Sequence, residues 1–159
     1  ARRTVGETDY LTWPRRALFD PLGMTSAVFE TDAAGTFVGS SFLFASARDW
    51  ARFGLLYAND GRGLLPESWV RFGATATPQA PDGKYGAHWW LKLSKELGGD
   101  TPSAALIPAD AFHALGHEGQ CLTIIPSRRL VVVRLGLSID ITAWNHADFL
   151  SELLTVLPD

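Results

Sequence analysis

Several features are scarce or missing in this sequence, and each absence excludes a class of protein. A single cysteine, Cys121, leaves no internal disulfide framework. Lys and Arg form no cluster and the net charge is -3, so the sequence offers no surface for nucleic acid. No apolar run approaches the ~20 residues of a membrane-spanning helix. What the chain does have is length and hydrophobicity. Its 159 residues, 47% of them hydrophobic, are enough for a single domain over residues 1–159 with a buried core.

The spacing of apolar residues and of helix-capping residues predicts several helices. They are expected at residues 8–20, 46–58, 66–72 and 143–157. The first must end at Pro21, because the residue before a proline avoids the α-helical region. The second begins with a capping box, in which Ser46 caps the helix and Asp49 stands three residues later.

Runs of β-branched and aromatic residues predict strands in the second half of the chain. They are expected at residues 85–93, 112–117, 120–125 and 130–135, and the last two form a hairpin. The run Leu130-Val131-Val132-Val133 is apolar on both faces, which indicates a central strand covered on both sides. Together with the helices, these strands predict an α+β fold in which an antiparallel β-sheet is flanked by helices.

The stretch Gly116-His117-Glu118-Gly119-Gln120 is the strongest candidate for a functional site. A His-x-Gly triplet on a strand that faces a cleft is typical of hydrolases, because glycine lets a substrate lie close to the backbone. The imidazole of His117 could orient or polarise a substrate, and the Gln120 N–H could stabilise a developing oxyanion. The alternative is a glycine-flanked turn with an exposed histidine.

Two other chemistries are open at this stretch. His113 and His117 lie four residues apart next to Glu118, which suggests a metal site if a helix placed both rings on one face. On a strand, about 13 Å of rise would separate the two rings, and no His-Glu-x-x-His motif is present. Cys121 could act as a nucleophile beside His117, but a lone cysteine in a strand is more often small, buried and inert.

Residues outside this stretch are candidates for the wall of a pocket. Gly39-Ser40-Ser41 is a loop of small residues that packs closely or lines a pocket, since it does not complete a Gly-x-Ser-x-Gly motif. Trp89 and Trp90 point to opposite faces of their expected strand, so one of them belongs to the core. The other forms an aromatic wall with Tyr85 or His88, or simply packs at the surface.

Five stretches of the sequence, in this order, resemble one family. They are Phe19-Asp20-Pro21-Leu22-Gly23-Met24, then Gly39-Ser40-Ser41 with Ala47-Arg48-Asp49-Trp50-Ala51-Arg52-Phe53-Gly54-Leu55-Leu56, then Leu65-Pro66-Glu67-Ser68-Trp69-Val70, then Tyr85-Gly86-Ala87-His88-Trp89-Trp90, and finally Gly116-His117-Glu118-Gly119-Gln120. Together they resemble the C-terminal half of a serine hydrolase of the class C β-lactamase, DD-peptidase and esterase superfamily. The resemblance covers nearly the whole chain and implies a partial β-lactamase/transpeptidase-like fold.

Members of that superfamily acylate a serine in a Ser-x-x-Lys motif, with a Tyr-x-Asn or Tyr-x-Ser second motif and a third motif of Lys-Thr-Gly or His-x-Gly. The resemblance assigns His117-Glu118-Gly119 to the third motif and the Gln120 N–H to half of the oxyanion hole. A histidine instead of a lysine in that motif resembles the peptidase and esterase branches. The implied substrate is a small amide or ester, with no cofactor and no metal. The candidate substrate-binding residues are Ser40, Ser41, Tyr85, His88, Trp90 and Glu118.

No Ser-x-x-Lys occurs in this sequence, and its first residues include neither a methionine start nor an apolar leader. We therefore expect the N-terminal half of the same protein to be the chain's main partner, and the chain alone to be inactive. An exposed strand edge would invite dimerisation. The resemblance suggests a periplasmic or other extracytoplasmic location for the parent protein. A non-catalytic binding or structural module that kept the fold is the alternative.

Overall fold

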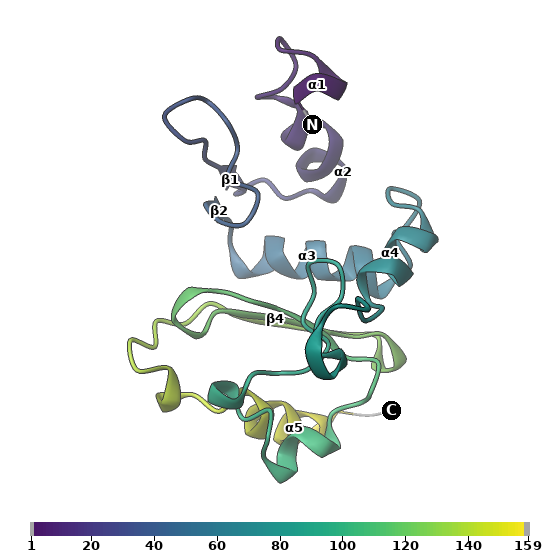
Figure 1. Cartoon of the computed structure of the whole chain (residues 1–159), viewed down its shortest axis with the longest axis vertical. Coiled ribbons are helices and arrows are strands. Elements are labelled where there is room, and N and C mark those ends of the chain that lie inside the picture. Colours follow the sequence, from purple (N-terminus) through teal and green to yellow (C-terminus); the bar gives the residue numbers. More distant parts are fainter. Residues whose placement is uncertain (1, 158–159) are drawn as a thin grey trace. The chain divides into compact units, whose positions relative to one another are not determined.

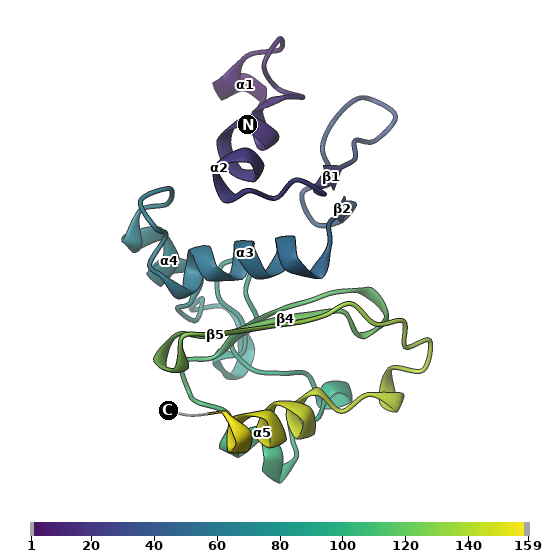
Figure 2. The ribbon, with the colours of Figure 1, turned by 180° about the vertical axis from the view of Figure 1, so that it is seen from behind.

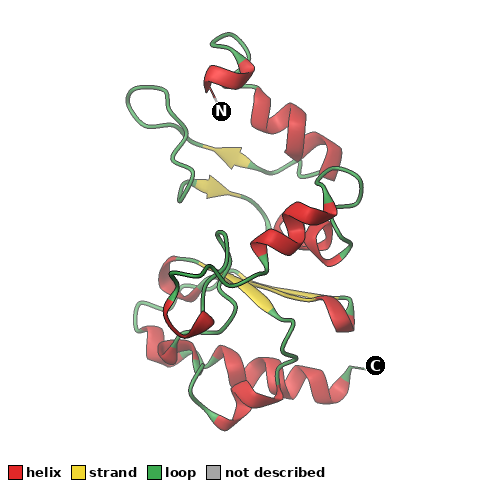
Figure 3. Cartoon of the chain, turned by 45° about the vertical axis from the view of Figure 1, so that its right-hand side comes forward, coloured by secondary structure: helices red, strands yellow, loops and turns green. Residues whose placement is uncertain are grey.

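The computed structural model describes residues 2–157, which divide into two compact units. The first unit ends at Phe53 and the second begins at Gly54. Helices and strands occur in both units, as Figure 3 shows, so the α+β class expected from the sequence is confirmed. The assignment of the whole chain to one domain stays a prediction.

The helical part of the first unit differs from the regular helix expected at residues 8–20. After a short helix, α1 (Arg2–Val5), the chain makes turns and then enters a π-helix, η1 (Arg15–Phe19), which leads directly into α2 (Asp20–Leu22). The helix therefore continues through Pro21, and the predicted end was wrong. Proline is tolerated in the first turn of an α-helical segment, and Pro21 is the second residue of α2. Gly23, with φ 67°, then ends the helix in the left-handed region.

A small hairpin packs beside this helical segment within the first unit. Strand β1 (Val28–Phe29) pairs antiparallel with β2 (Leu43–Phe44). Phe29 of β1 stacks on Phe37 of the connecting loop, with ring centres 4.5 Å apart. The core of the unit consists of buried Phe19, Met24 and Ala27, with Leu18, Leu22, Phe29, Leu43, Ala45 and Phe53 packed around them.

Helix α3 (Ala47–Ala58) is capped at its start as the sequence predicts, but by a different arrangement. The Ser46 hydroxyl accepts from the Asp49 N–H at 3.3 Å, which is the expected half of the capping box. The Asp49 carboxylate does not return to Ser46. It accepts from the N–H and hydroxyl of Ser26, and the Ser26 hydroxyl accepts from the Ser46 N–H at 2.9 Å. The Ser26 hydroxyl thus connects the Ser46 N–H to the Asp49 carboxylate, which in a regular capping box would bond directly. The same hydroxyl is the largest cause of the lowered pKa of Asp49.

The second unit is built on a three-stranded antiparallel sheet. Its strands are β3 (Phe112–Leu115), β4 (Cys121–Ile125) and β5 (Leu130–Arg134), in the order β3-β4-β5. The predicted hairpin of β4 and β5 is confirmed, with Cys121 opposite Arg134 and Ile125 opposite Leu130. The central strand is β4, and all five of its residues are buried. The expectation that residues 130–133 form the central strand was wrong, because β5 is an edge strand of the described sheet.

The apolar character of β5 on both faces has another cause, which is that helices cover both faces of the sheet. Helix α5 (His146–Val156) lies along one face, and the part of α3 that belongs to the second unit, from Gly54 on, lies against the other (Figures 1 and 2). Val132 packs on the cluster that contains Ala147 and Leu150 of α5. On the opposite face, a Cβ added at Gly54 of α3 would lie 2.5 Å from Val131. The absence of a side chain at Gly54 therefore allows the helix to approach the sheet closely.

The region expected as a strand at residues 85–93 is instead a tight turn. The Gly86 N–H donates to the Trp89 carbonyl at 2.8 Å, and His88 has φ 68°, which an extended strand cannot contain. Trp90 then pairs with His113, with backbone N–H···O distances of 2.9 and 2.7 Å, so this residue continues the sheet beside β3. The other described helices are α4 (Glu67–Gly73), preceded by Pro66, and the short 3₁₀ turns η2 (Pro81–Gly83), η3 (Lys95–Leu97), η4 (Pro102–Leu106), η5 (His117–Gly119), η6 (Pro126–Arg128) and η7 (Ile141–Ala143).

Candidate functional site

The His-x-Gly stretch lies on a glycine-flanked turn between β3 and β4, which was the alternative left open by the sequence, and not on a strand. Gly116 donates its N–H to the Gln120 carbonyl at 2.8 Å, which closes a five-residue loop. Glu118 has φ 55° and Gly119 has φ 76°. Two successive residues in the left-handed region cannot belong to an extended strand, so the backbone reverses here.

This turn leaves the candidate side chains on the surface. The side chain of His117 is 87% exposed, and its Nε2 lies 3.5 Å from the carboxylate of Glu118. Gly119 is buried, while Gln120 is exposed. The imidazole of His117 can therefore be reached by a ligand, and core side chains do not cover it.

The Gln120 N–H, which the sequence assigns to an oxyanion hole, has a partner in this structure. It donates to the carbonyl of His117 at 3.3 Å, at the long end of the range for such bonds. The side-chain amide of Gln120 donates to the same carbonyl at 3.2 Å. A substrate oxygen would have to replace the His117 carbonyl as acceptor before this N–H could stabilise it.

A buried chain of hydrogen bonds connects two histidines beneath the sheet. The Thr123 hydroxyl lies 2.9 Å from His113 Nδ1 and 2.9 Å from His146 Nε2, and all three residues are at most 2% exposed. Trp144 donates its Nε1–H to His146 Nδ1 at 3.2 Å. Because the indole nitrogen can only donate, Nδ1 of His146 is the acceptor and its proton is on Nε2. His146 Nε2–H therefore donates to the Thr123 hydroxyl, and that hydroxyl donates to His113 Nδ1.

Burial determines the protonation of both rings. Desolvation, with a smaller effect of His146, lowers the pKa of His113 to about 3. Desolvation, with a smaller effect of Arg134, lowers the pKa of His146 to about 4. Both imidazoles are therefore neutral at physiological pH.

The metal site proposed for His113 and His117 is wrong for this structure. His113 is a buried strand residue bonded to Thr123, whereas His117 extends into solvent from the turn. Among residues 2–157, no group of three or more His, Cys, Asp or Glu side chains could hold a metal ion.

Cys121 is packed in the core and unsuited to nucleophilic attack. It is 3% exposed and donates its thiol to the Gly119 carbonyl at 3.4 Å. Burial raises the pKa of the Cys121 thiol to about 11, so the reactive thiolate does not form near neutral pH.

The aromatic wall expected from the sequence is formed by Tyr85 and Trp90. Their rings meet edge to face with centres 4.9 Å apart, whereas Trp89 is 4% exposed and belongs to the core. Tyr85 and Trp90 line a pocket of about 480 Å³ whose other lining residues are Thr77, Gln79, Ala80, Asp82 and Lys84. His88 is exposed and is not among the residues that line this pocket.

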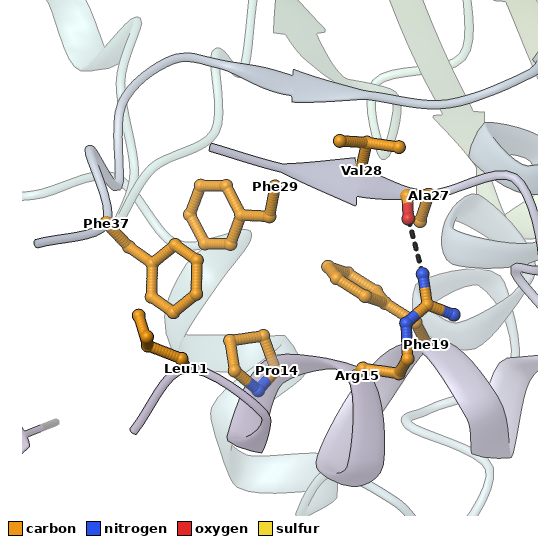
Figure 4. Close-up of a pocket in the computed structure, with 8 residues that line it drawn as sticks. All are labelled: Leu11, Pro14, Arg15, Phe19, Ala27, Val28, Phe29 and Phe37. Atoms are coloured by element: carbon orange, nitrogen blue, oxygen red, sulfur yellow. Dashed lines mark hydrogen bonds between the residues drawn. The ribbon is translucent and has the colours of Figure 1, made fainter. Parts of the chain in front are cut away.

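The first unit contains Ser40 and Ser41 and a pocket of its own. Both serines lie exposed on a turn, and the Ser41 N–H donates to the Val38 carbonyl at 3.1 Å. Figure 4 shows the pocket, of about 220 Å³, where Arg15 donates to the Ala27 carbonyl at 2.6 Å. Neither serine is among its lining residues, which are Leu11, Pro14, Arg15, Phe19, Ala27, Val28, Phe29 and Phe37.

Comparison with known families agrees with this architecture. The model of the family described as "Beta-lactamase" matches residues 1–136. The chain belongs to the beta-lactamase family. No curated protein gave a match.

Two solved structures are similar to this beta-lactamase-family chain. One is the "putative 6-aminohexanoate-dimer hydrolase" of Bacillus anthracis, with 26% identity and a TM-score of 0.60, over 92% of this chain and 39% of the other. The second is the "putative beta-lactamase" of Bacteroides dorei DSM 17855, with 19% identity and a TM-score of 0.56, over 89% of this chain and 49% of the other. The chain thus spans less than half the length of either protein. These matches confirm the partial beta-lactamase-like fold.

Several residues that shape the candidate site were not found by sequence reasoning. Arg134 and Ser138 both contact the His117–Gly119 turn, and Gln79, Asp82 and Lys84 line the pocket beside Trp90. One signal was available for the first of these: Arg134 is the only charged residue of an otherwise apolar strand.

Within residues 2–157, no helix has the length and apolar character needed to cross a membrane.

Proposed function

We propose that this chain provides the third-motif wall of a serine hydrolase site in the beta-lactamase family. The reaction is cleavage of a small amide or ester through an acyl-enzyme. A serine oxygen attacks the substrate carbonyl, the amine or alcohol leaves with a proton, and water then hydrolyses the serine ester. The nucleophile comes from polypeptide outside these 159 residues, since they contain no Ser-x-x-Lys.

The observation that carries this proposal is the exposed turn that presents His117 and Gln120. His117 is free of the core, and its ring can orient the substrate or the leaving group. The Gln120 N–H has only a long bond of 3.3 Å to the His117 carbonyl. A developing oxyanion at about 2.7–3.1 Å would be the stronger acceptor and would replace that carbonyl.

The pocket beside Tyr85 and Trp90 supports binding of an apolar part of the substrate. Trp90 pairs with His113, which lies four residues before His117 along the chain. From His113, strand β3 continues only to Leu115, about 7 Å along the strand, before the turn that carries His117 begins. A substrate that uses both features is therefore extended. An extended substrate also fits the 6-aminohexanoate dimer that the name of the Bacillus anthracis hydrolase gives for that protein.

The first experiment exposes the 159-residue chain to a fluorophosphonate probe and to a chromogenic cephalosporin. Without a nucleophile, the oxyanion-binding groups leave only residual acceleration and nothing to label, so we expect neither labelling nor measurable turnover. Stoichiometric labelling of this chain would show that it contains its own nucleophile, and the proposal would be wrong.

The second experiment uses a longer polypeptide in which a Ser-x-x-Lys segment precedes this chain. His117→Ala should lower kcat for an ester substrate by about 100-fold or more, the usual contribution of an acid, base or polarising group. Lys95→Ala changes a similarly exposed side chain, 82% accessible, and should leave kcat unchanged. Equal rates for wild type and His117→Ala would show that His117 takes no part in the reaction.

We also propose an extracytoplasmic location for the longer protein, which is tested by fractionating the cells that produce it.

A further inference from the structure

The guanidinium of Arg134 makes three contacts at the base of the His117–Gly119 turn. Its Nη1 donates to the Gly119 carbonyl at 2.6 Å and its Nη2 donates to the Ser138 hydroxyl at 2.7 Å. Its central carbon lies 4.5 Å from the centre of the Trp144 ring. A planar, forked cation fits this arrangement, because it bonds two acceptors while its face stacks on an aromatic ring.

The backbone around Arg134 leaves space that only glycine provides. A Cβ at Gly119 would lie 2.9 Å from Nη1, and a Cβ at Gly136 would lie 2.4 Å from the central carbon of the guanidinium. Gly136 has no positive φ, and the guanidinium of Arg134 occupies the space that a side chain at this position would take. The two glycines therefore form a slot for the arginine head group.

The segment after β5 holds the turn at a second point. The Ser138 N–H donates to the Glu118 carbonyl at 3.0 Å, and the Ser138 hydroxyl is itself bonded to Arg134. The carbonyls of Glu118 and Gly119 are thus both fixed from residues 134–138. Glu118 adopts φ 55°, a left-handed conformation that is unfavourable for a residue with a side chain. Such a turn needs contacts from outside to keep its conformation.

We infer that Arg134 is a positioning residue for the turn that carries His117 and Gln120. It fixes the Gly119 carbonyl on the buried side of the turn, so the exposed side keeps one orientation toward a ligand. Trp144 supports the guanidinium from the other side, and Trp144 is in turn held by His146. The consequence for catalysis rests on the function proposed above, whereas the effect on the turn does not.

Two variants of the 159-residue chain test this inference by independent routes. Arg134→Lys keeps the charge but replaces the fork with a single ammonium, which cannot reproduce the planar, stacked geometry. Gly136→Ala keeps the arginine and displaces its head group by steric conflict. We expect both to increase amide hydrogen exchange at Gln120 by about 10-fold or more and to change the NMR shifts of the His117 ring. Exchange in β4 should not change. Arg71→Lys, at an exposed ion pair with Glu67, is the matched control.

The possible outcomes separate the positioning role from the proposed function. If neither variant alters exchange at Gln120 or the His117 resonances, the positioning role is wrong. In the longer polypeptide, we expect Arg134→Lys to lower kcat by about 10-fold with KM little changed. A loosened turn in a longer polypeptide that never hydrolyses an ester or amide would keep Arg134 as a positioning residue and refute the proposed function. If the variants leave hydrogen exchange at Gln120 unchanged while the longer polypeptide hydrolyses an ester or amide, the positioning role is refuted and the proposed function is kept.

Discussion

Replacing Thr123 by valine removes one hydroxyl from the buried bridge between two histidines and leaves the size of the side chain nearly unchanged. Thr123 is 0% exposed, and its hydroxyl lies 2.9 Å from both His113 Nδ1 and His146 Nε2. In the variant, the His146 N–H and the His113 lone pair both lose their partner in a part of the core from which water is excluded.

The expected cost follows from the two groups left without partners. An unsatisfied buried polar group costs about 1–3 kcal/mol, so two of them cost about 2–6 kcal/mol. Burying a methyl group instead of a hydroxyl offsets part of this loss of stability. We therefore expect the free energy of unfolding to fall by about 3 kcal/mol, a large part of the 5–15 kcal/mol that is typical of a domain.

The assay is urea unfolding at pH 7, followed by tryptophan fluorescence and circular dichroism. Thr155→Val on α5 makes the same chemical change at an exposed hydroxyl and should alter stability by about 0.5 kcal/mol or less. In the His146→Leu background, Thr123→Val should cost less than in the wild type, because one of the two partners is already missing. A cost below about 1 kcal/mol in the wild type would refute the bridge as drawn.

Four further predictions concern other parts of the molecule. The low pKa values of His113 and His146, against about 6.5 when unfolded, mean that the unfolded chain binds more protons below pH 6.5. The free energy of unfolding should then decrease as the pH is lowered from 6.5 to about 4.5, by up to about 2.7 kcal/mol per pH unit for the two histidines together. A urea midpoint that stays constant over this pH range would contradict the prediction. Gly54→Ala should lose about 1–2 kcal/mol in urea unfolding, despite the better helix propensity of alanine, because its Cβ meets Val131. Trp90→Ala should raise KM of the longer polypeptide for an apolar substrate by about 10-fold with kcat retained, and an unchanged KM would exclude the pocket from binding. The edge strand β5 should allow dimers to form, and light scattering that shows only monomers at high concentration would contradict this expectation.

The parts of the fold that sequence predicted well are those governed by local chemistry. Ser46 caps α3, Asp60 and Gly61 follow its end, and Pro126 to Arg129 connect β4 to β5 as expected. Each of these depends on hydrogen bonds or backbone preferences within a few residues. Local patterns of this kind can be recognised without knowing what packs against them.

The errors arose where distant contacts override local preference. An apolar run such as Leu130-Val131-Val132-Val133 does not distinguish a central strand from an edge strand that helices cover on both faces. The positive φ at His88 and Glu118 likewise cannot be read from residue types that usually avoid it. The anchor of the candidate turn, Arg134, lies 15 residues after Gly119 and meets it only through strand pairing.

The buried state of Cys121 has a practical consequence. A thiol whose pKa is near 11 and which is 3% exposed reacts slowly with alkylating reagents at neutral pH, and it is the chain's one cysteine. A second cysteine introduced on the surface, for example at Lys95, would therefore accept a fluorophore or spin label alone. Single-site labelling of the wild-type background is then available without first removing a native side chain from the core.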